Sequence, residues 1–514
     1  MTHATTAVRS SSNNRAAETM TVRLTESEDE ICRLLERVAD YIHEKQTAEP
    51  RLTLRIAGGW VRDKLLGLES HDVDVAVDHM SGFELAQQVN AYLAEHGQAV
   101  HTIAKIGQNP ERSKHLETAT TSVLGQAIDF VNLRTETYSS TSRVPQMAFG
   151  TATEDAQRRD ITINALFYNI HTRAVEDFTG RGLSDLQARV VRTPLEPVQT
   201  FADDPLRVLR VVRFASRFDF RIDEDTEAAM RLPQIHAALD TKISRERVGV
   251  ELDKMAAGAR PLLAIRLMLR LGLYAAVFRA PPHAPAPTEP VESAASVTET
   301  VLDLLDARDA AGELVARLPT ASAVTAPATR RALVLAAYTF PYHGTTVADG
   351  RRTAALAAVV VRDGLKLSSH DAETTAALHA LAPRLAAAAE TCAAGGMGRQ
   401  ALGLLVRDAG ARWPAGAVFA AAVDVYRGMQ PAAAAAKYAA LAAAIDAHGL
   451  AEAYALKPLV DGRAAARILD IRPGPRIRDV LEQVMAWQLD HPEATPAECE
   501  EFIRRDIAPG LHTG

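Results

Sequence analysis

Cysteine is scarce in this chain. The three cysteines, Cys32, Cys392 and Cys499, lie far apart and form no CxxC pair. An odd number of cysteines at such spacings excludes a disulfide framework and a zinc knuckle. The cysteine pattern therefore indicates a protein of a reducing compartment.

Long hydrophobic runs and an excess of positive charge are also missing. Stretches such as "ALVLAAYTF" fall short of the roughly 18 residues that a membrane-spanning helix needs, so we expect no membrane association. The formal net charge of -7 excludes a basic coat over the whole surface. Any site for a polyanion must therefore be a local cluster of basic residues.

Acidic residues are absent from the first 17 residues, which contain Arg9, Arg15 and many serines and threonines. This composition is typical of a mitochondrial transit peptide, and a disordered terminus explains it equally well. Met20 offers a second start. We therefore expect a protein of the cytoplasm or nucleus with an additional mitochondrial form.

The composition supplies enough apolar material for several cores. A chain of 514 residues, 47% of them hydrophobic, exceeds the roughly 250 to 300 residues at which single cores stop growing. Strand and helix patterns alternate up to about Leu186, and strand patterns almost vanish after Phe201. We predict an α+β protein, with a small mixed-sheet head followed by an all-α neck, body and tail. The predicted boundaries are 1–24 for an N-terminal extension, 25–186 for the head, 187–278 for the neck, 279–297 for a Pro/Ala-rich linker or loop, and 298–514 for the body and tail.

Two aspartates, Asp72 and Asp74, lie side by side in "DVDVAV". In an extended strand they share one face, while Val73, Val75 and Val77 share the other. Two adjacent carboxylates repel each other unless a cation lies between them, and oxygen ligands suit Mg2+. Taken alone, such a pair is more often a solvated loop edge before a strand.

A glycine pair precedes these aspartates. Gly58 and Gly59 end a predicted strand and lead into a short predicted helix with Arg62 on its first turn. Backbone N–H groups at such a turn suit a phosphate, although a glycine pair alone is only a tight turn. Together with the aspartates, the turn predicts a site for a nucleoside triphosphate and its metal.

"GGWVRDKLLG" followed by "DVDVA" resembles the signature of the nucleotidyltransferase head shared by tRNA CCA-adding enzymes of the bacterial and eukaryotic class and by bacterial poly(A) polymerases. The resemblance implies that Asp72 and Asp74 hold two Mg2+ ions for in-line displacement. "AIDFVNLR" is similar to the family strand that brings a third carboxylate, here Asp129. From the residues alone, an acid at this position serves equally well as a structural hydrogen-bond acceptor.

The stretch "RRDITINALFYN" is similar to the ribose-recognising motif of the family. The resemblance implies that Arg159 contacts the triphosphate and Asp160 the sugar. The alternative is a helix start that carries surface charge.

"DDPLRVLRVVRFASRF" resembles the base-recognising motif of the family. The resemblance implies that Asp204 and Arg207 bind the edge of the incoming base, and that Arg210 and Arg213 face phosphate or brace the other two. An acceptor beside a donor matches cytosine and adenine but not uracil or guanine. The alternative is a solvated basic helix face.

The C-terminal stretch "LKPLVDGRAAARILDIRPGPRIRDVLEQVMAWQLDHPEAT" is similar to the RNA-contacting tail of these enzymes. Gly474, Arg476 and Arg478 at its Gly-Pro turn are the candidate contacts to RNA phosphate. An ordinary helical hairpin explains the same pattern.

The resemblance as a whole implies an enzyme that adds CMP, CMP and AMP from CTP and ATP to tRNA lacking its 3' CCA, and we expect a monomer. "TYSSTSRVPQMAFGTATEDAQRRD" resembles the eukaryotic members. The alternatives are a poly(A) polymerase, an enzyme that adds only C or only A, and, from another class, a non-catalytic RNA-binding protein.

Overall fold

The computed structural model describes residues 20–46, 51–106, 118–139, 142–306, 312–318, 321–472 and 474–511. The chain divides into two compact units. The first consists of Met1–Val211 with Phe220–Met230, and the second of Val212–Asp219 with Arg231–Gly514. Residues 1–19 of the predicted N-terminal extension lie outside the described residues.

A mixed sheet forms the centre of the first unit, as predicted. Among the described residues it has seven strands in the order β3-β4-β5-β2-β1-β8-β9, in which β2 and β5 run parallel and the other neighbouring pairs antiparallel. The strands are β1 (Leu54–Ala57), β2 (Val73–Val77), β3 (Ala104–Ile106), β4 (Thr118–Val123), β5 (Gln126–Asn132), β8 (Phe167–Asn169) and β9 (Ala174–Glu176). A separate hairpin consists of β6 (Arg134–Ser139) and β7 (Ser142–Phe149).

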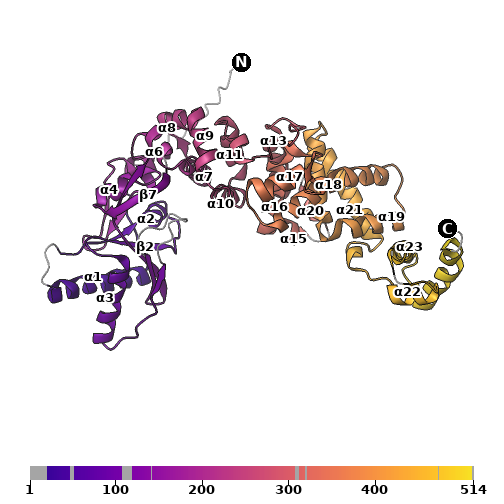
Figure 1. Ribbon diagram of the computed structural model, residues 1–514, viewed down its shortest axis with the longest axis horizontal. Coiled ribbons are helices and arrows are strands. Elements are labelled where there is room, and N and C mark those ends of the chain that lie inside the picture. Colours follow the sequence, from indigo (N-terminus) through magenta and orange to yellow (C-terminus); the bar gives the residue numbers. More distant parts are fainter. Residues whose placement is uncertain are drawn as a thin grey trace, which may run out of the picture. The chain divides into compact units, whose positions relative to one another are not determined.

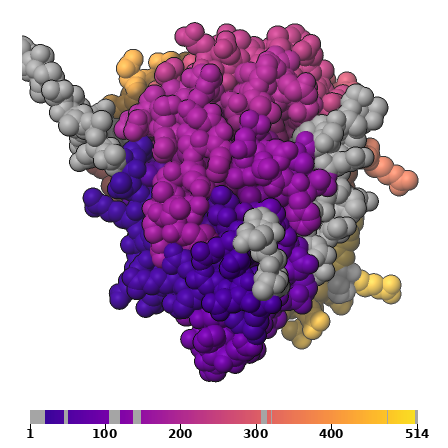
Figure 2. Space-filling view, turned by 90° about the vertical axis from the view of Figure 1, so that its left-hand side faces the viewer, coloured from indigo at the N-terminus to yellow at the C-terminus, as the bar shows by residue number. Residues whose placement is uncertain are grey.

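Helices α1 (Glu26–Gln46) and α3 (Gly82–Glu95) pack against each other and against strands of this sheet (Figure 1). On one side of β2 and β5 the apolar side chains, such as Val75 and Phe130, are fully buried. At Gly82 a Cβ atom would lie only 2.0 Å from the backbone oxygen of Phe130, so only glycine allows α3 to approach β5 this closely. Figure 2 shows the indigo and purple surface of this unit.

Helices make up most of the remaining chain. Besides α1 and α3, the first unit contains α2 (Gly59–Leu65), α4 (Ala152–Gln157), α5 (Gly182–Ala188), α6 (Pro197–Asp203) and α8 (Glu224–Met230). Helix α7 (Leu206–Phe218) contributes to both units. The second unit continues with α9 (Pro233–Lys242), α10 (Arg245–Ala256), α11 (Pro261–Arg270), α12 (Tyr274–Val277), α13 (Ser293–Leu305), α14 (Gly312–Arg317), α15 (Ala321–Thr325), α16 (Pro327–Tyr338) and α17 (Leu356–Val359).

The alanine-rich body is a bundle of α18 (Ser369–Ala393), α19 (Arg399–Ala409), α20 (Trp413–Tyr426) and α21 (Pro431–Ala447) with α13 and α16. Alanine at the contacts lets these helices approach closely around the large buried rings of Trp413, Phe419 and Tyr438. The tail helices α22 (Gly462–Ile468), α23 (Pro475–Asp490), α24 (Pro496–Phe502) and α25 (Ala508–Leu511) have a small core of their own. Every helix among the described residues is too short or too polar to cross a membrane.

A short hairpin interrupts the helical body where the sequence patterns predicted almost no strands. Strands β12 (Thr346–Asp349) and β13 (Arg352–Ala355) pair antiparallel around Gly350, whose φ is 64°. Each strand has four residues, and most of their side chains are exposed or half-buried. The buried-exposed alternation that identifies a strand is therefore too short to recognise from the sequence.

Candidate active site

Three carboxylates meet at the parallel pair β2–β5. Asp74 on β2 and Asp129 on β5 are Cα partners in this ladder, and Asp72 directly precedes β2. One carboxylate oxygen from each of the three lies within 4.8 Å of the other two. The structure thus brings the predicted third carboxylate to the predicted pair.

The three carboxylates repel one another electrostatically. Burial, with the neighbouring charges of Asp72 and Asp129, raises the pKa of Asp74 to about 6, although Arg159 and Arg134 act in the opposite direction. Asp129 accepts a hydrogen bond of 2.5 Å from the hydroxyl of Thr120. Because all three groups offer oxygen, the donor set fits a hard divalent cation better than zinc.

The glycine turn at Gly58 lies beside Arg159. Gly58 has φ 73° and donates its N–H to the carbonyl of Leu166 at 2.9 Å. A Cβ atom at Gly58 would lie 2.6 Å from Nη1 of Arg159. Glycine at this position therefore leaves room for the Arg159 guanidinium.

Arg62 lies on the first turn of α2, where a contact to phosphate was expected, but its position is enclosed by protein. Its side chain is buried, donates to Asp63 at 2.8 Å and also donates to the amide oxygen of Asn164. Gly59 begins α2 next to it. The described contacts of Arg62 thus hold α2 against the segment that carries Asp160.

Arg159 and Asp160 are both held by protein partners. Arg159 pairs with Asp155 at 2.9 Å, donates to the carbonyl of Asn164 at 3.0 Å and lies over the ring of Phe167. Oδ2 of Asp160 accepts a hydrogen bond of 2.7 Å from Nε of Arg210 and lies 2.7 Å from Nη2 of the same guanidinium. Although burial raises the pKa of the Asp160 carboxyl, Arg210 and the amide of Asn164 together lower it to about 2.

The residues of the predicted basic helix face bind different partners. Arg207 donates to the carbonyl of Arg158 at 2.7 Å, and Asp204 caps the start of α7 by accepting from the backbone N–H of Leu206 at 3.1 Å. Arg213, one turn beyond Arg210, pairs instead with Glu251 of α10 at 2.6 Å. The structure therefore brings Arg207 and Arg210 to the Arg158–Asp160 segment, places Asp204 at the start of α7 and binds Arg213 within the second unit.

Three supporting residues were missed by the sequence analysis. Thr120 faces Asp129 only because β4 and β5 pair in this register. Glu136 has a buried carboxylate that accepts from Arg158 at 2.9 Å, and one of its oxygens lies 3.8 Å from Arg207. Asn164, four residues after Asp160, has a spacing that could have indicated a contact. The contact of Thr120 depends on strand pairing, and that of Glu136 depends on the packing of α4 against β6.

The predicted RNA contacts of the tail lie at the start of α23. Gly474 is the N-cap residue of this helix, and Arg476 is exposed. Arg478 pairs with Glu482 at 3.1 Å, and its side chain is 84% exposed. Gly474 and Arg478 also line a groove of about 1060 Å³ whose other walls include Leu404, Ile477 and Leu481.

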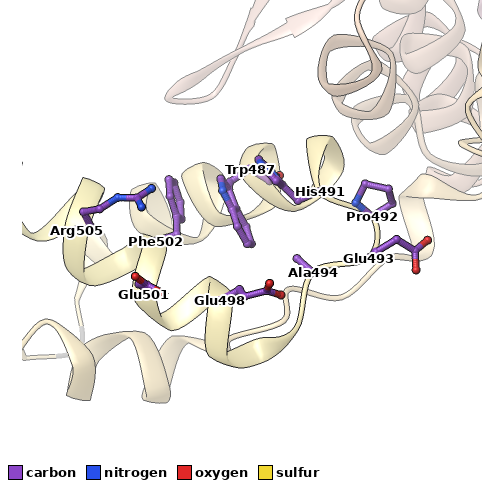
Figure 3. A pocket seen from close by; sticks show the side chains of 9 residues that line it. All are labelled: Trp487, His491, Pro492, Glu493, Ala494, Glu498, Glu501, Phe502 and Arg505. Carbon is purple, nitrogen blue, oxygen red and sulfur yellow. The ribbon is translucent and has the colours of Figure 1, made fainter.

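A second hollow of the tail lies between α23 and α24 (Figure 3). The ring of Trp487 is stacked between His491 and Phe502, with centroids 4.5 and 5.0 Å away. The acids Glu493, Glu498 and Glu501 line the same hollow, with Arg505 at its end. Its acidic lining makes this hollow a poor site for a polyanion.

Comparison with known proteins gives two matching families. Residues 54–192 match the family described as "Poly A polymerase head domain", and residues 219–285 match "Probable RNA and SrmB- binding site of polymerase A". The first range contains the three carboxylates, and the second contains Glu251.

Several proteins resemble the chain over nearly its whole length. It is 38% identical to the mitochondrial CCA tRNA nucleotidyltransferase of Saccharomyces cerevisiae over 525 aligned residues, which cover 95% of this chain and 96% of that protein. It is 36% identical to tRNA nucleotidyltransferase cca1 of Schizosaccharomyces pombe, with 95% and 97% covered. Among solved structures, the CCA-adding enzyme of Bacillus stearothermophilus in complex with CTP shares the fold with a TM-score of 0.60 at 18% identity, covering 96% of this chain and 100% of that one.

Proposed function

Because the chain belongs to the family of CCA tRNA nucleotidyltransferases, we propose that it adds CMP, CMP and AMP from CTP and ATP to the 3' end of tRNA. In each step the 3'-hydroxyl oxygen of the RNA forms a bond to the α-phosphorus of the triphosphate. The bond from that phosphorus to pyrophosphate breaks, and the hydroxyl proton is released.

The observation that carries this proposal is the cluster of Asp72, Asp74 and Asp129. Its oxygen donors fit Mg2+, and we propose that two ions bind there. When bound, these ions would favour deprotonation of the 3'-hydroxyl and offset the charge of the triphosphate. The parallel ladder of β2 and β5 keeps the carboxylates together, and Thr120 fixes the orientation of Asp129.

We propose that the glycine turn and Arg159 bind the triphosphate. Gly59 and Arg62 belong to the same proposed site. Support comes from the room that Gly58 leaves for the Arg159 guanidinium. A guanidinium group offers several donors to phosphate oxygens. Arg62 then acts by holding α2 in place through Asp63 and Asn164.

The sugar is assigned to Asp160. Both of its oxygens already accept hydrogen bonds, from Arg210 on one side and from Asn164 and a backbone N–H on the other. A carboxylate has about four lone-pair positions, so a ribose hydroxyl can share an oxygen with these donors.

Base selection is assigned to Asp204 and Arg207. Arg207 donates one N–H to the carbonyl of Arg158, which restricts the movement of the guanidinium group. An aspartate that accepts from an exocyclic amine, beside an arginine that donates to a ring nitrogen, fits cytosine and adenine. Uracil and guanine present the opposite pattern.

The test is addition to a tRNA transcript that ends before CCA, with each labelled triphosphate alone and in pairs. We expect CTP alone to give two additions, ATP alone none, and both together three. A long product from ATP alone would identify a poly(A) polymerase, and a stop after the two cytidines would identify a partial enzyme. Absence of any product, with tRNA binding intact, would favour a non-catalytic RNA-binding protein.

We also propose that a form of this protein is imported into mitochondria. Its support is the acid-poor stretch before Met20 and the mitochondrial names of relatives such as that of Saccharomyces cerevisiae. The test is a fluorescent reporter fused to residues 1–19, compared with the same reporter fused to the chain from Met20. A diffuse cytosolic signal from the first fusion would contradict mitochondrial import.

A further inference from the structure

A basic cavity of about 330 Å³ lies in the second unit, at the C-terminal ends of α7 and α10. Four of its eight lining residues are cationic and none is acidic; they are Arg213, Ser216, Arg217, Lys254, Met255, Gly258, Ala259 and Arg260. The chain as a whole has a net charge of -7. This cavity is thus a local concentration of positive charge on an acidic protein.

Aromatic rings support the two arginines of α7 that line the cavity, out of four in that helix. Arg213 lies over the ring of Phe214 and Arg217 over that of Phe218, with 4.1 and 4.9 Å between guanidinium carbon and ring centroid. The two rings are themselves parallel, with an interplanar angle of 2°. The guanidinium groups therefore lie one helical turn apart on supports that limit their movement.

Two of the four cations of the cavity, Arg213 and Arg260, pair with nearby acids. Glu251 pairs with Arg213 at 2.6 Å, and Asp219 pairs with Arg260 at 3.2 Å, the latter pair being half exposed. Neither acid lines the cavity. Lys254 has no ion pair among the residues that the structure describes, so its positive charge is one that an anion would stabilise.

We infer that this cavity binds a phosphate group. Guanidinium groups bind phosphate oxygens through paired N–H donors, and a lysine ammonium adds a point charge. The phosphate is either a phosphodiester of an RNA strand or a free anion such as inorganic phosphate or pyrophosphate. The inference does not depend on the proposed function, because binding is measured without nucleotide addition.

The test uses the full chain and two double variants with the same change in charge. Lys254→Gln with Arg217→Gln removes two exposed charges from the cavity. Arg266→Gln with Lys457→Gln removes two charges from elsewhere in the second unit and is the control. The single variant Lys254→Gln is included so that a folding defect of the double variant leaves a second measurement.

One arm of the test measures the affinity for a 12-nucleotide single-stranded RNA by fluorescence anisotropy at several salt concentrations. The other arm measures the rise in Tm caused by inorganic phosphate and by pyrophosphate. If RNA supplies the phosphate, the slope of log K against log salt falls by about 2 in the cavity double variant and about 1 in Lys254→Gln. If a free anion supplies it, the Tm rise is lost in the cavity variants and kept in the control. Cavity variants that match the control in both arms would overturn the inference.

Discussion

Asp74 of β2 and Asp129 of β5 lie opposite each other in a parallel strand pair, so two carboxylates from distant parts of the sequence form one site. Their proximity, together with burial and Asp72, raises the pKa of Asp74 to about 6. A group of acids held in this way is stabilised by a cation. The arrangement explains why removal of any one member should affect every addition step.

We predict that Asp74→Ala and Asp129→Ala each reduce the addition of both C and A about 10³-fold or more, because a bound metal contributes several kcal/mol to the reaction barrier. The measurement is single-turnover addition with each triphosphate. Binding of Mn2+ without nucleotide, followed by electron paramagnetic resonance, should weaken in parallel. Asp219→Asn, in the other unit, is the control, and retained activity in Asp129→Ala would remove Asp129 from the site.

Base choice should depend on Asp204 and Arg207. Loss of one buried hydrogen-bond partner costs about 1 to 3 kcal/mol, which corresponds to a roughly tenfold to hundredfold loss of discrimination. Asp204→Ala should therefore let UTP or GTP compete in misincorporation assays on tRNA that ends before CCA. Asp203→Asn, which changes the adjacent acid bound to Gln199, is the control. An unchanged ranking of the four nucleotides in both Asp204→Ala and Arg207→Ala would contradict the assignment.

Gly58→Ala should weaken triphosphate binding beyond any effect of its lower stability. The residue has φ 73°, and its new Cβ would lie 2.6 Å from Nη1 of Arg159. Gly67→Ala is a matched control, since Gly67 has φ 72° and no atom within 4 Å of the added Cβ. Both variants should lose stability because a Cβ disfavours a positive φ, and Gly58→Ala should lose more because its ψ of -121° lies outside the left-handed helical region and its Cβ meets Arg159. Only Gly58→Ala should raise KM for CTP and ATP, by roughly tenfold or more; equal KM values in the two variants would disprove a role for Arg159.

Acid stability should depend on Asp160. Its pKa is lowered to about 2 in the folded chain, whereas an unfolded aspartate has a pKa of about 3.9. A lowered pKa stabilises the fold above about pH 4, and this stabilisation is lost as the pH falls toward 2. Asp160→Asn should thus lose roughly 2 kcal/mol of unfolding free energy at pH 7.

Urea unfolding at a series of pH values measures this effect. The gap between wild type and Asp160→Asn should narrow as the pH falls from 4 to 3. Arg210→Gln should reduce the same pH dependence, because it removes the cation that pairs with Asp160. A gap that stays constant with pH would show that Asp160 contributes by packing alone.

Arg476 and Arg478 should contribute to tRNA affinity without affecting nucleotide choice. The double variant Arg476→Gln with Arg478→Gln should lower the salt dependence of tRNA binding by about 2 in log–log slope. Arg504→Gln with Arg505→Gln, which removes two exposed arginines near the acidic hollow of the tail, is the control. Equal affinities in the two double variants would mean that the start of α23 faces away from the RNA.

Local features of this protein follow from the sequence alone. The alternation in "DVDVAV" determines that Asp72 and Asp74 share one side of a strand while the valines are buried, since side chains alternate along any extended chain. The change from mixed patterns to helical patterns likewise determines the sheet-containing head and the helical remainder. These properties depend on neighbouring residues only.

Contacts between distant residues were decided by the tertiary structure. The four arginines of α7 have similar spacings, yet Arg207 and Arg210 bind the Arg158–Asp160 segment while Arg213 binds Glu251 of α10. Thr120 meets Asp129 only through the register of β4 on β5. Helical and strand periods specify the side of an element on which a residue lies, but the partner on that side depends on how remote segments pack, because the free energy of a contact depends on burial and geometry that no local pattern contains.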